Sequence, residues 1–358
     1  MSAFTLNTST TPISNARRTS VDKNALILSV TIILAVFIVV SIVGNGIVCF
    51  VFYRQPSLRK PSFYPILSLA IADLLCATFA MPTYIAKKYV IDGAWRERAV
   101  CNVFRFSYFF TMYASVLSLT VISLERFTAI KMPMRHWTWL TSRKMTAALV
   151  LSWLDAAIVS ALPFHWRISS KKRCTYNPTK TWSVMVIVMN VFIPFLVMSF
   201  CHFYTFSFAV SYSRKKRNLK HRGKLRTHAH VINSKALERE RDITCTLAVV
   251  VGVFVLCFGP SSFYYFISVV CPECYRSAFQ RIESIFNAIV KIMTFTSACV
   301  NPLIYYWLNQ SMRNAFWRSF LRKSEVRRRR FSELKKFAEM KGGGTGGAIT
   351  PFHICSKD

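Results

Sequence analysis

Charge is scarce in this chain, and acidic charge is scarcest. Only 17% of the 358 residues are charged, whereas soluble domains carry about a quarter. Lys and Arg number 47 against 15 Asp and Glu. In a soluble protein such a basic excess would indicate a nucleic-acid partner. Here most basic residues lie in blocks between long apolar runs, which is typical of a membrane protein. We therefore expect membrane lipid, and no nucleic acid, as a partner.

The sequence also lacks the short motifs that carry enzyme chemistry. It has no Gly-rich phosphate loop, no metal-ligand cluster and no hydrolase motif. We therefore predict that the chain is not an enzyme. The first 24 residues are polar and lack the apolar core of a cleavable signal peptide. The first apolar run is expected to direct its own insertion.

Seven apolar runs are each long enough to cross a bilayer, for which a helix needs about 20 mostly apolar residues. They cover roughly 25–53, 62–88, 99–131, 144–164, 182–212, 242–270 and 281–308. The predicted fold is an all-α membrane protein with a seven-transmembrane helix bundle over 25–308. A transporter or channel would predict inverted repeats or interrupted spans with facing charges, and the sequence shows no such repeat.

Basic residues predict the orientation of this bundle. The segment 213–241 contains SRKKRNLKHRGKLR, and the tail contains RRRR at 327–330. With seven spans these segments lie on one side, which the positive-inside rule makes cytoplasmic. We expect 1–24 to be an extracellular N-terminal tail and 213–241 to be the third cytoplasmic loop. Residues 323–358 are expected to be a basic, disordered cytoplasmic tail that touches anionic lipid.

Several features fall on the predicted outside. Four of the 11 cysteines lie there, where an oxidising environment permits disulfides. Cys271 and Cys274 form a CPEC sequence that could close a small ring. A C-x-x-C pair also occurs in zinc and redox sites, but one pair supplies too few zinc ligands. Asn7 opens an NTS sequon and is a glycosylation candidate, although the motif also fits a chance match.

An adjacent pair of opposite charges ends the third apolar run. Glu125 and Arg126 follow a stretch that is almost entirely apolar from Val103 onward. From Cys101 to Arg126 is 25 residues, and a helix of that length covers about 37 Å. Cys101 can therefore lie at one membrane interface and the charged pair at the other. Taken alone, the pair fits an interfacial anchor equally well.

Together the motifs resemble a rhodopsin-like (class A) G-protein-coupled receptor. The matching segments are GNGIV (44–48), LSLAIADLL (67–75), LERF (124–127), FVLCFGP (254–260) and NPLIY (301–305), one for each of five spans. MRNAFWRSFL at 312–321 resembles the family's amphipathic eighth helix, expected over 309–322. The resemblance implies a plasma-membrane receptor that binds an extracellular ligand and activates heterotrimeric G proteins by outward movement of the sixth helix. Arrestin is a further expected partner.

The resemblance also implies a latch and a disulfide. It makes Arg126 the arginine that meets the G protein, held at rest by Glu125 and by Glu240 at the inner end of the sixth helix. The alternative is that LERERD at 237–242 is a solvated, charged helix end. The same resemblance pairs Cys101 with Cys174.

A network of buried residues is expected, from the resemblance, to carry activation. Its members are Asn45, Asp73, Ser115, His202, Phe254, Phe258, Pro260, Asn301, Pro302 and Tyr305. Asp73 and Ser115 are candidate ligands for a structural sodium ion, and no other cofactor is expected. Asp73 fits a protonated or water-bonded structural role equally well. Phe258 replaces the family's usual tryptophan, and His202 and Phe127 replace tyrosines. We therefore expect a divergent member.

Two positions argue against well-known ligand classes of the family. Tyr108 stands where amine receptors carry an aspartate, and Phe295 stands where opsins carry the chromophore lysine. We expect neither a standard amine receptor nor an opsin, unless Lys291 carries a chromophore.

Lys291 lies about 15 Å outward of Asn301 along the helix. It either meets an acidic ligand group or snorkels outward. The ligand is expected to be a small molecule or peptide, with a preference for an acidic group. Pocket candidates are Tyr108, Met112, Phe263, Tyr264, Glu283, Phe286, Asn287 and Lys291.

Overall fold

The computed structural model describes residues 12–89, 94–132, 141–162, 179–221, 228–279, 282–310 and 312–319. The chain divides into two units, one up to Arg313 and one from Asn314 onward. The elements of the first unit are α1 (Pro12–Arg54), α2 (Tyr64–Leu75), α3 (Met81–Tyr89), α4 (Ala94–Lys131), α6 (Ser142–Ala161), α7 (Lys180–Ile187), α8 (Ile193–His221), α9 (His228–Val270), α10 (Pro272–Phe279) and α11 (Glu283–Leu308). Short 3₁₀ turns at Pro56–Leu58 and Pro61–Phe63 connect α1 to α2.

Seven helical spans confirm the predicted all-α membrane fold. Among the described residues they are Asn24–Arg54, Pro61–Lys87, Ala99–Lys131, Ser142–Ala161, Lys180–Phe208, Cys245–Val270 and Ile285–Leu308. Large apolar side chains such as Leu151, Leu196 and Leu256 leave most of their surface exposed. Exposed apolar surface on this scale is unfavourable in water and favourable in contact with lipid.

Two of the spans contain a π-helical turn. Cys76–Ala80 joins α2 to α3, and Val188–Phe192 joins α7 to α8. A π turn adds a residue to the helix and so changes which side chains face inward afterwards. In the fifth span the turn buries Asn190 and Val191, and Val191 lines the cavity described below.

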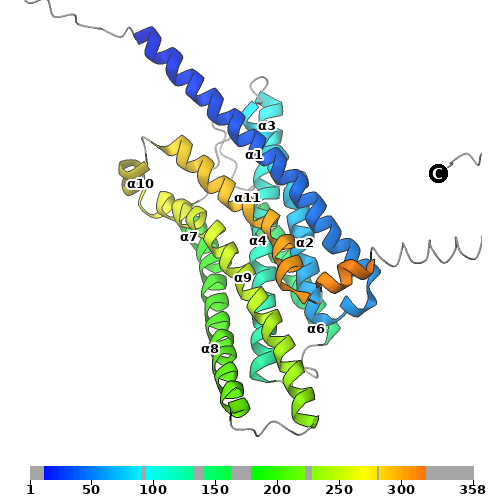
Figure 1. The fold of residues 1–358 in the computed structure, drawn as a ribbon. Coiled ribbons are helices and arrows are strands. Elements are labelled where there is room, and N and C mark those ends of the chain that lie inside the picture. Colours follow the sequence, from blue (N-terminus) through cyan, green and yellow to red (C-terminus); the bar gives the residue numbers. More distant parts are fainter. Residues whose placement is uncertain are drawn as a thin grey trace, which may run out of the picture. The chain divides into compact units, whose positions relative to one another are not determined.

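The third span, α4, lies at the centre of the bundle and packs against α2, α6 and α8 (Figure 1). A buried polar chain ties three of these helices together. The indole Nε1 of Trp153 on α6 donates to Ser68 Oγ on α2 over 2.8 Å. That hydroxyl lies 2.8 Å from Ser118 Oγ on α4. Such bonds fix the relative rotation of the helices where apolar packing alone is not directional.

The first and last spans approach each other closely through a glycine. A Cβ atom added at Gly44 would lie 2.9 Å from Cγ and 3.0 Å from Cβ of Pro302 on α11. The next residue, Asn45, donates from Nδ2 to the carbonyl oxygen of Ala298 over 2.9 Å. A small residue at a helix crossing permits this approach. The GNG sequence therefore lets α1 pack closely against the part of α11 that carries the NPLIY motif.

A short C-terminal helix follows α11 and covers residues 312–319, which confirms the expected eighth helix over part of its predicted range. Asn309 caps its start, because its side-chain Oδ1 accepts a hydrogen bond from the Met312 backbone N–H over 3.0 Å.

Candidate functional site

One end of α4 carries the buried charged pair. Glu125 and Arg126 are both buried. The Glu125 carboxylate accepts from Arg126 Nε through Oε2, and from Nη2 through Oε1 over 2.5 Å. The two-bond geometry holds the guanidinium plane against the carboxylate. Glu240 lies on α9, but its side chain is outside the described part of the structure, and so is its predicted contact with Arg126.

His202 on α8 contacts α4 at Ser123, two residues before Glu125. Its Nε2 lies 3.0 Å from Ser123 Oγ. Its Nδ1 is buried, as is the Tyr305 hydroxyl on α11, and neither has a hydrogen-bond partner within the described ranges. Phe127 packs its ring against Tyr204, with centroids 5.0 Å apart. His202 and Tyr305, both predicted activation residues, thus each keep one polar atom without a hydrogen bond to a described residue.

Asp73 sits at the polar centre of the bundle. It is buried, and its Oδ2 accepts from Asn301 Nδ2 over 2.9 Å. Ser115 is also buried, and its hydroxyl has no partner among the residues described. The Ser297 hydroxyl instead donates to Thr294 O over 2.7 Å. Asp73 and Ser115 supply oxygen atoms of the kind that hard cations take. No cluster of three His, Cys, Asp or Glu side chains with metal-binding geometry occurs in the described segments.

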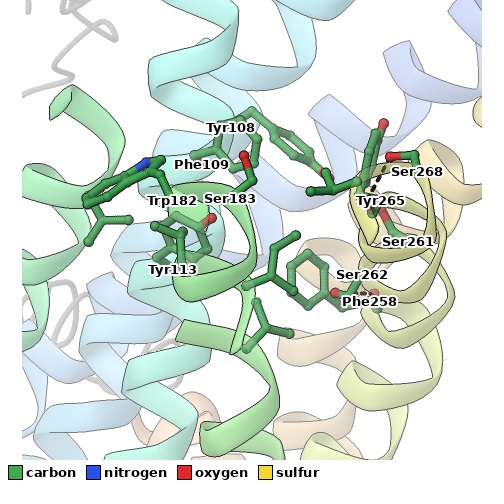
Figure 2. Close-up of a pocket in the computed structure, with 15 residues that line it drawn as sticks. Tyr108, Phe109, Tyr113, Trp182, Ser183, Phe258, Ser261, Ser262, Tyr265 and Ser268 are labelled. Atoms are coloured by element: carbon green, nitrogen blue, oxygen red, sulfur yellow. Dashed lines mark hydrogen bonds between the residues drawn. The ribbon is translucent and has the colours of Figure 1, made fainter. Parts of the chain in front are cut away.

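A cavity of about 370 Å³ lies in the half of the bundle opposite the Glu125–Arg126 pair. Figure 2 shows the residues that line it. Its lining residues are Tyr108, Phe109, Tyr113, Val159, Trp182, Ser183, Val186, Ile187, Val191, Phe258, Ser261, Ser262, Tyr265, Ser268 and Val269. They come from α4, α6, α7, the π turn after α7, and α9. Volumes of a few hundred Å³ with apolar walls and a few polar groups are typical of small-ligand sites. Tyr108 lies 18 residues before Arg126 on α4, which corresponds to about 27 Å.

Local structure positions two walls of this cavity. Thr179 caps α7 by accepting from the Trp182 backbone N–H over 3.3 Å, which fixes the turn that carries Trp182. The Phe258 ring packs against that of Phe254 one turn away on α9, tilted by 36° and with centroids 5.5 Å apart. Phe195 on α8 meets the Phe258 ring at 6.1 Å. The aromatic residues of α8 and α9 therefore continue from the cavity floor toward the charged end.

The structure brings only part of the predicted pocket together. Tyr108 lines the cavity, and the Nζ of the buried Lys291 lies 3.5 Å from the centroid of its ring. Lys291 therefore does not snorkel outward. Met112 is buried in the core, Asn287 is half-buried, and neither lines the cavity.

Phe263 requires a correction. Its side chain is 59% exposed and lies on the outer surface of α9, so it does not line the cavity. The helical phase explains this, because Ser261, Ser262 and Tyr265 follow Phe258 at three, four and seven residues. Phe263 follows at five residues, about 140° away. The spacing from Phe258 could have identified these three lining residues, whereas no sequence signal pointed to Trp182.

Tyr264, Phe286 and Glu283 belong to a separate group, here called the outer aromatic cluster and defined by Tyr264, Tyr275, Phe279, Phe286 and Glu283. The Tyr275 hydroxyl lies 2.6 Å from that of Tyr264 and donates to Glu283 Oε1 over 2.9 Å. Partial burial, together with these two hydrogen bonds, raises the pKa of the Tyr275 hydroxyl. The cluster joins α9, α10 and α11 at this end of the bundle.

Disulfides also lie at this end. Cys271 and Cys274 are bonded at the start of α10, with Cα atoms 5.3 Å apart. Cys101 is disulfide-bonded as well, and its predicted partner, Cys174, lies outside the described residues, as does the sequon at Asn7.

A bundle of seven spans, with a ligand-sized cavity toward one end and a buried Glu–Arg pair at the other, defines a membrane receptor. Residues 44–305 match the family model described as 7 transmembrane receptor (rhodopsin family). The chain therefore belongs to this family. It is a multi-pass membrane receptor and not an enzyme.

Several characterised receptors are similar to this chain. The human histamine H2 receptor is 26% identical over 323 residues, which cover 86% of this chain and 84% of that receptor. The human alpha-1D adrenergic receptor is 30% identical over 85% of this chain and 58% of its own length. The alpha-1A adrenergic receptor of Oryzias latipes is 26% identical over 79% and 65%, respectively. The exclusion of a standard amine site, based on Tyr108, stays a prediction.

Proposed function

We propose that this G-protein-coupled receptor stands in the plasma membrane with its N-terminus outside and its C-terminus in the cytoplasm. An extracellular ligand occupies the cavity beside Tyr108, and the Arg126 end of the bundle engages a heterotrimeric G protein. The observation that carries this proposal is the position of Phe258. It lines the cavity and also contacts Phe254, the next aromatic ring along α9 on the side away from the cavity.

The ligand acts on α9 through Phe258 and its contact with Phe254. Pro260 lies inside α9, where it removes a backbone donor and weakens the helix locally. A ligand that pushes on Phe258 therefore acts beside a natural bending point. Bending there moves the part of α9 that precedes Pro260 outward, away from α4. The NPLIY segment, with Asn301, Pro302 and Tyr305, adjusts together with it.

In the resting state Arg126 is held by Glu125, and Glu240 completes the latch between α4 and α9. The bidentate contact between Glu125 and Arg126 supports this role. Outward movement of α9 exposes the guanidinium to the G protein. Arrestin competes for the same face once the receptor is active. Asp73, with Ser115, holds a sodium ion that favours the resting state.

The ligand is a small molecule or peptide, and it carries an acidic group. The cavity contains no acidic lining residue, whereas Lys291 lies directly behind its tyrosine wall. This distribution is opposite to that needed for an amine ligand.

The test is a ligand-library screen in cells that carry dissociation sensors for each G-protein class. The proposal expects ligand-dependent dissociation of at least one G protein, abolished by Phe258→Ala at equal surface expression. It also expects Glu240→Ala to raise basal signalling. Substrate flux through the protein in cells that lack G proteins would refute the proposal.

A further inference from the structure

Lys291 presents an unusual electrostatic problem. It lies on α11 with only 5% of its surface exposed. Its Nζ lies 3.5 Å from the ring centroid of Tyr108, 4.8 Å from that of Tyr265 and 5.8 Å from that of Phe104. No carboxylate of the described residues lies within ion-pair distance of it. Three aromatic rings therefore surround this amino group, and no described carboxylate pairs with it.

Aromatic faces compensate only part of the cost of burying a charge. A cation–π contact contributes about 2 kcal/mol when desolvated, whereas an ion loses several kcal/mol when it leaves water. Buried charges in proteins are normally paired for this reason. The site around Lys291 is incomplete in the sense that one negative charge would stabilise it.

The neighbouring cavity has room for that charge but does not supply it. None of its 15 lining residues is charged. A cationic ligand would be buried here next to Lys291 without a counter-charge, whereas an anionic ligand would meet the ammonium. Tyr108 and Tyr265 line the cavity (Figure 2). Their ring centroids lie 3.5 Å and 4.8 Å from Nζ, so the two rings separate Lys291 from the cavity.

A second polar group, the hydroxyl of Ser261, indicates where the rest of the ligand lies. Ser261 lines the cavity, and its buried hydroxyl lies near that of Tyr108 without forming a hydrogen bond of normal geometry to any described residue. It follows Phe258 by almost one turn of α9. The remaining wall is mainly aromatic and aliphatic, and Trp182 carries its largest ring. These features fit an apolar or aromatic body that carries one further hydrogen-bonding group.

We infer that Lys291 is the charge-recognition residue of this receptor, and that its ligand is a small carboxylate with an aromatic or apolar body. The carboxylate binds Nζ after the Tyr108 ring turns aside, and the body fills the cavity against Trp182 and Phe258. This inference rests on the proposed function for the location of the ligand. It adds the class of ligand and the residue that selects it.

The test uses probes that share one body and differ in charge. Indole-3-acetate, its methyl ester and tryptamine form one set, and 3-phenylpropionate, its methyl ester and 3-phenylpropylamine form another. Binding is measured as a dissociation constant, fitted to the rise in melting temperature of the purified, detergent-solubilised receptor with probe concentration. G-protein activation by the same probes is measured separately. Binding of the carboxylates without activation supports the present inference alone, because the ligand-library screen decides the proposed function separately.

We expect the carboxylate of each set to bind the wild-type receptor more tightly than the ester or the amine. Lys291→Gln should weaken carboxylate binding about 30-fold or more, because truncation of one buried charge leaves the other unpaired. Lys291→Arg should retain the preference for acids. The matched control is Lys87→Gln, which removes an exposed charge whose Nζ lies 5.3 Å from the Phe104 ring centroid. Water and salt screen an exposed charge, so this control should change binding less than about threefold.

Three results would overturn the inference. One is a wild-type receptor that binds the esters or amines as tightly as the acids, or that shows no acid-dependent shift. Another is unchanged carboxylate binding in Lys291→Gln. The third is an equal loss in Lys87→Gln, which would indicate a diffuse positive potential in place of a specific residue. Should Lys291→Gln fail to reach the cell surface, the charge-matched probes on the wild type and on Lys291→Arg still decide the question.

Discussion

The crossing of α1 and α11 at Gly44 allows a quantitative prediction about stability. A Cβ at this position would lie 2.9 Å from Pro302 Cγ and 3.0 Å from Pro302 Cβ. Carbon atoms normally approach to about 3.5–4.0 Å. The proline ring is rigid and cannot turn away as the end of a long side chain could. In Gly44→Ala the two helices must therefore separate by about half an ångström or more.

The magnitude follows from two opposing effects. Overpacking of a tight contact costs about 1–3 kcal/mol. Alanine is favoured over glycine inside a helix by about 1 kcal/mol. Gly46 separates these effects, because a Cβ there meets nothing within 4 Å. Gly46→Ala should therefore be neutral or stabilising by up to about 1 kcal/mol. Gly44→Ala should be about 1–3 kcal/mol less stable than Gly46→Ala, since the propensity gain is common to both.

The assay is thermal unfolding of the solubilised receptor, followed with a dye that becomes fluorescent on reaction with thiols. Cys76, Cys201 and Cys299 are buried free cysteines and report loss of the fold. Both alanine variants are compared with the wild type at equal protein concentration. If Gly44→Ala melts at or above the temperature of Gly46→Ala, the close approach of α1 to Pro302 is wrong.

Three further predictions concern the bonds that hold the bundle. Glu125→Gln should raise basal G-protein signalling severalfold at equal surface expression, because it removes the charge that holds the buried Arg126; unchanged basal signalling would argue against a resting clamp. Ser68→Ala should lower stability by about 1–3 kcal/mol in the same thermal assay, because the Trp153 N–H loses its acceptor; an unchanged melting temperature would contradict this. Tyr275→Phe should speed backbone hydrogen exchange in α10, because both hydroxyl contacts disappear, and exchange at the wild-type rate would show that these contacts do not hold α10.

The sequence by itself determined the class of this protein. Seven apolar runs predict the fold because a helix is the simplest way to satisfy every backbone group of a single segment in lipid. The short motifs around Asn45, Asp73, Arg126 and Asn301 stand in a fixed order, so the family could be identified without coordinates. The eighth helix was also expected, from the resemblance of MRNAFWRSFL to the family's amphipathic helix.

Side-chain neighbourhoods between spans required the tertiary structure. Phe263 and Ser261 are two residues apart, yet one is exposed and the other lines the cavity, because the rotation of α9 is set by its contacts with other helices. Lys291 was equally compatible with an outward or an inward side chain. Only the convergence of α4, α9 and α11 decided that it is enclosed by Phe104, Tyr108 and Tyr265. Periodicity tells which residues share a face of a helix, but the packing of seven helices decides what that face meets.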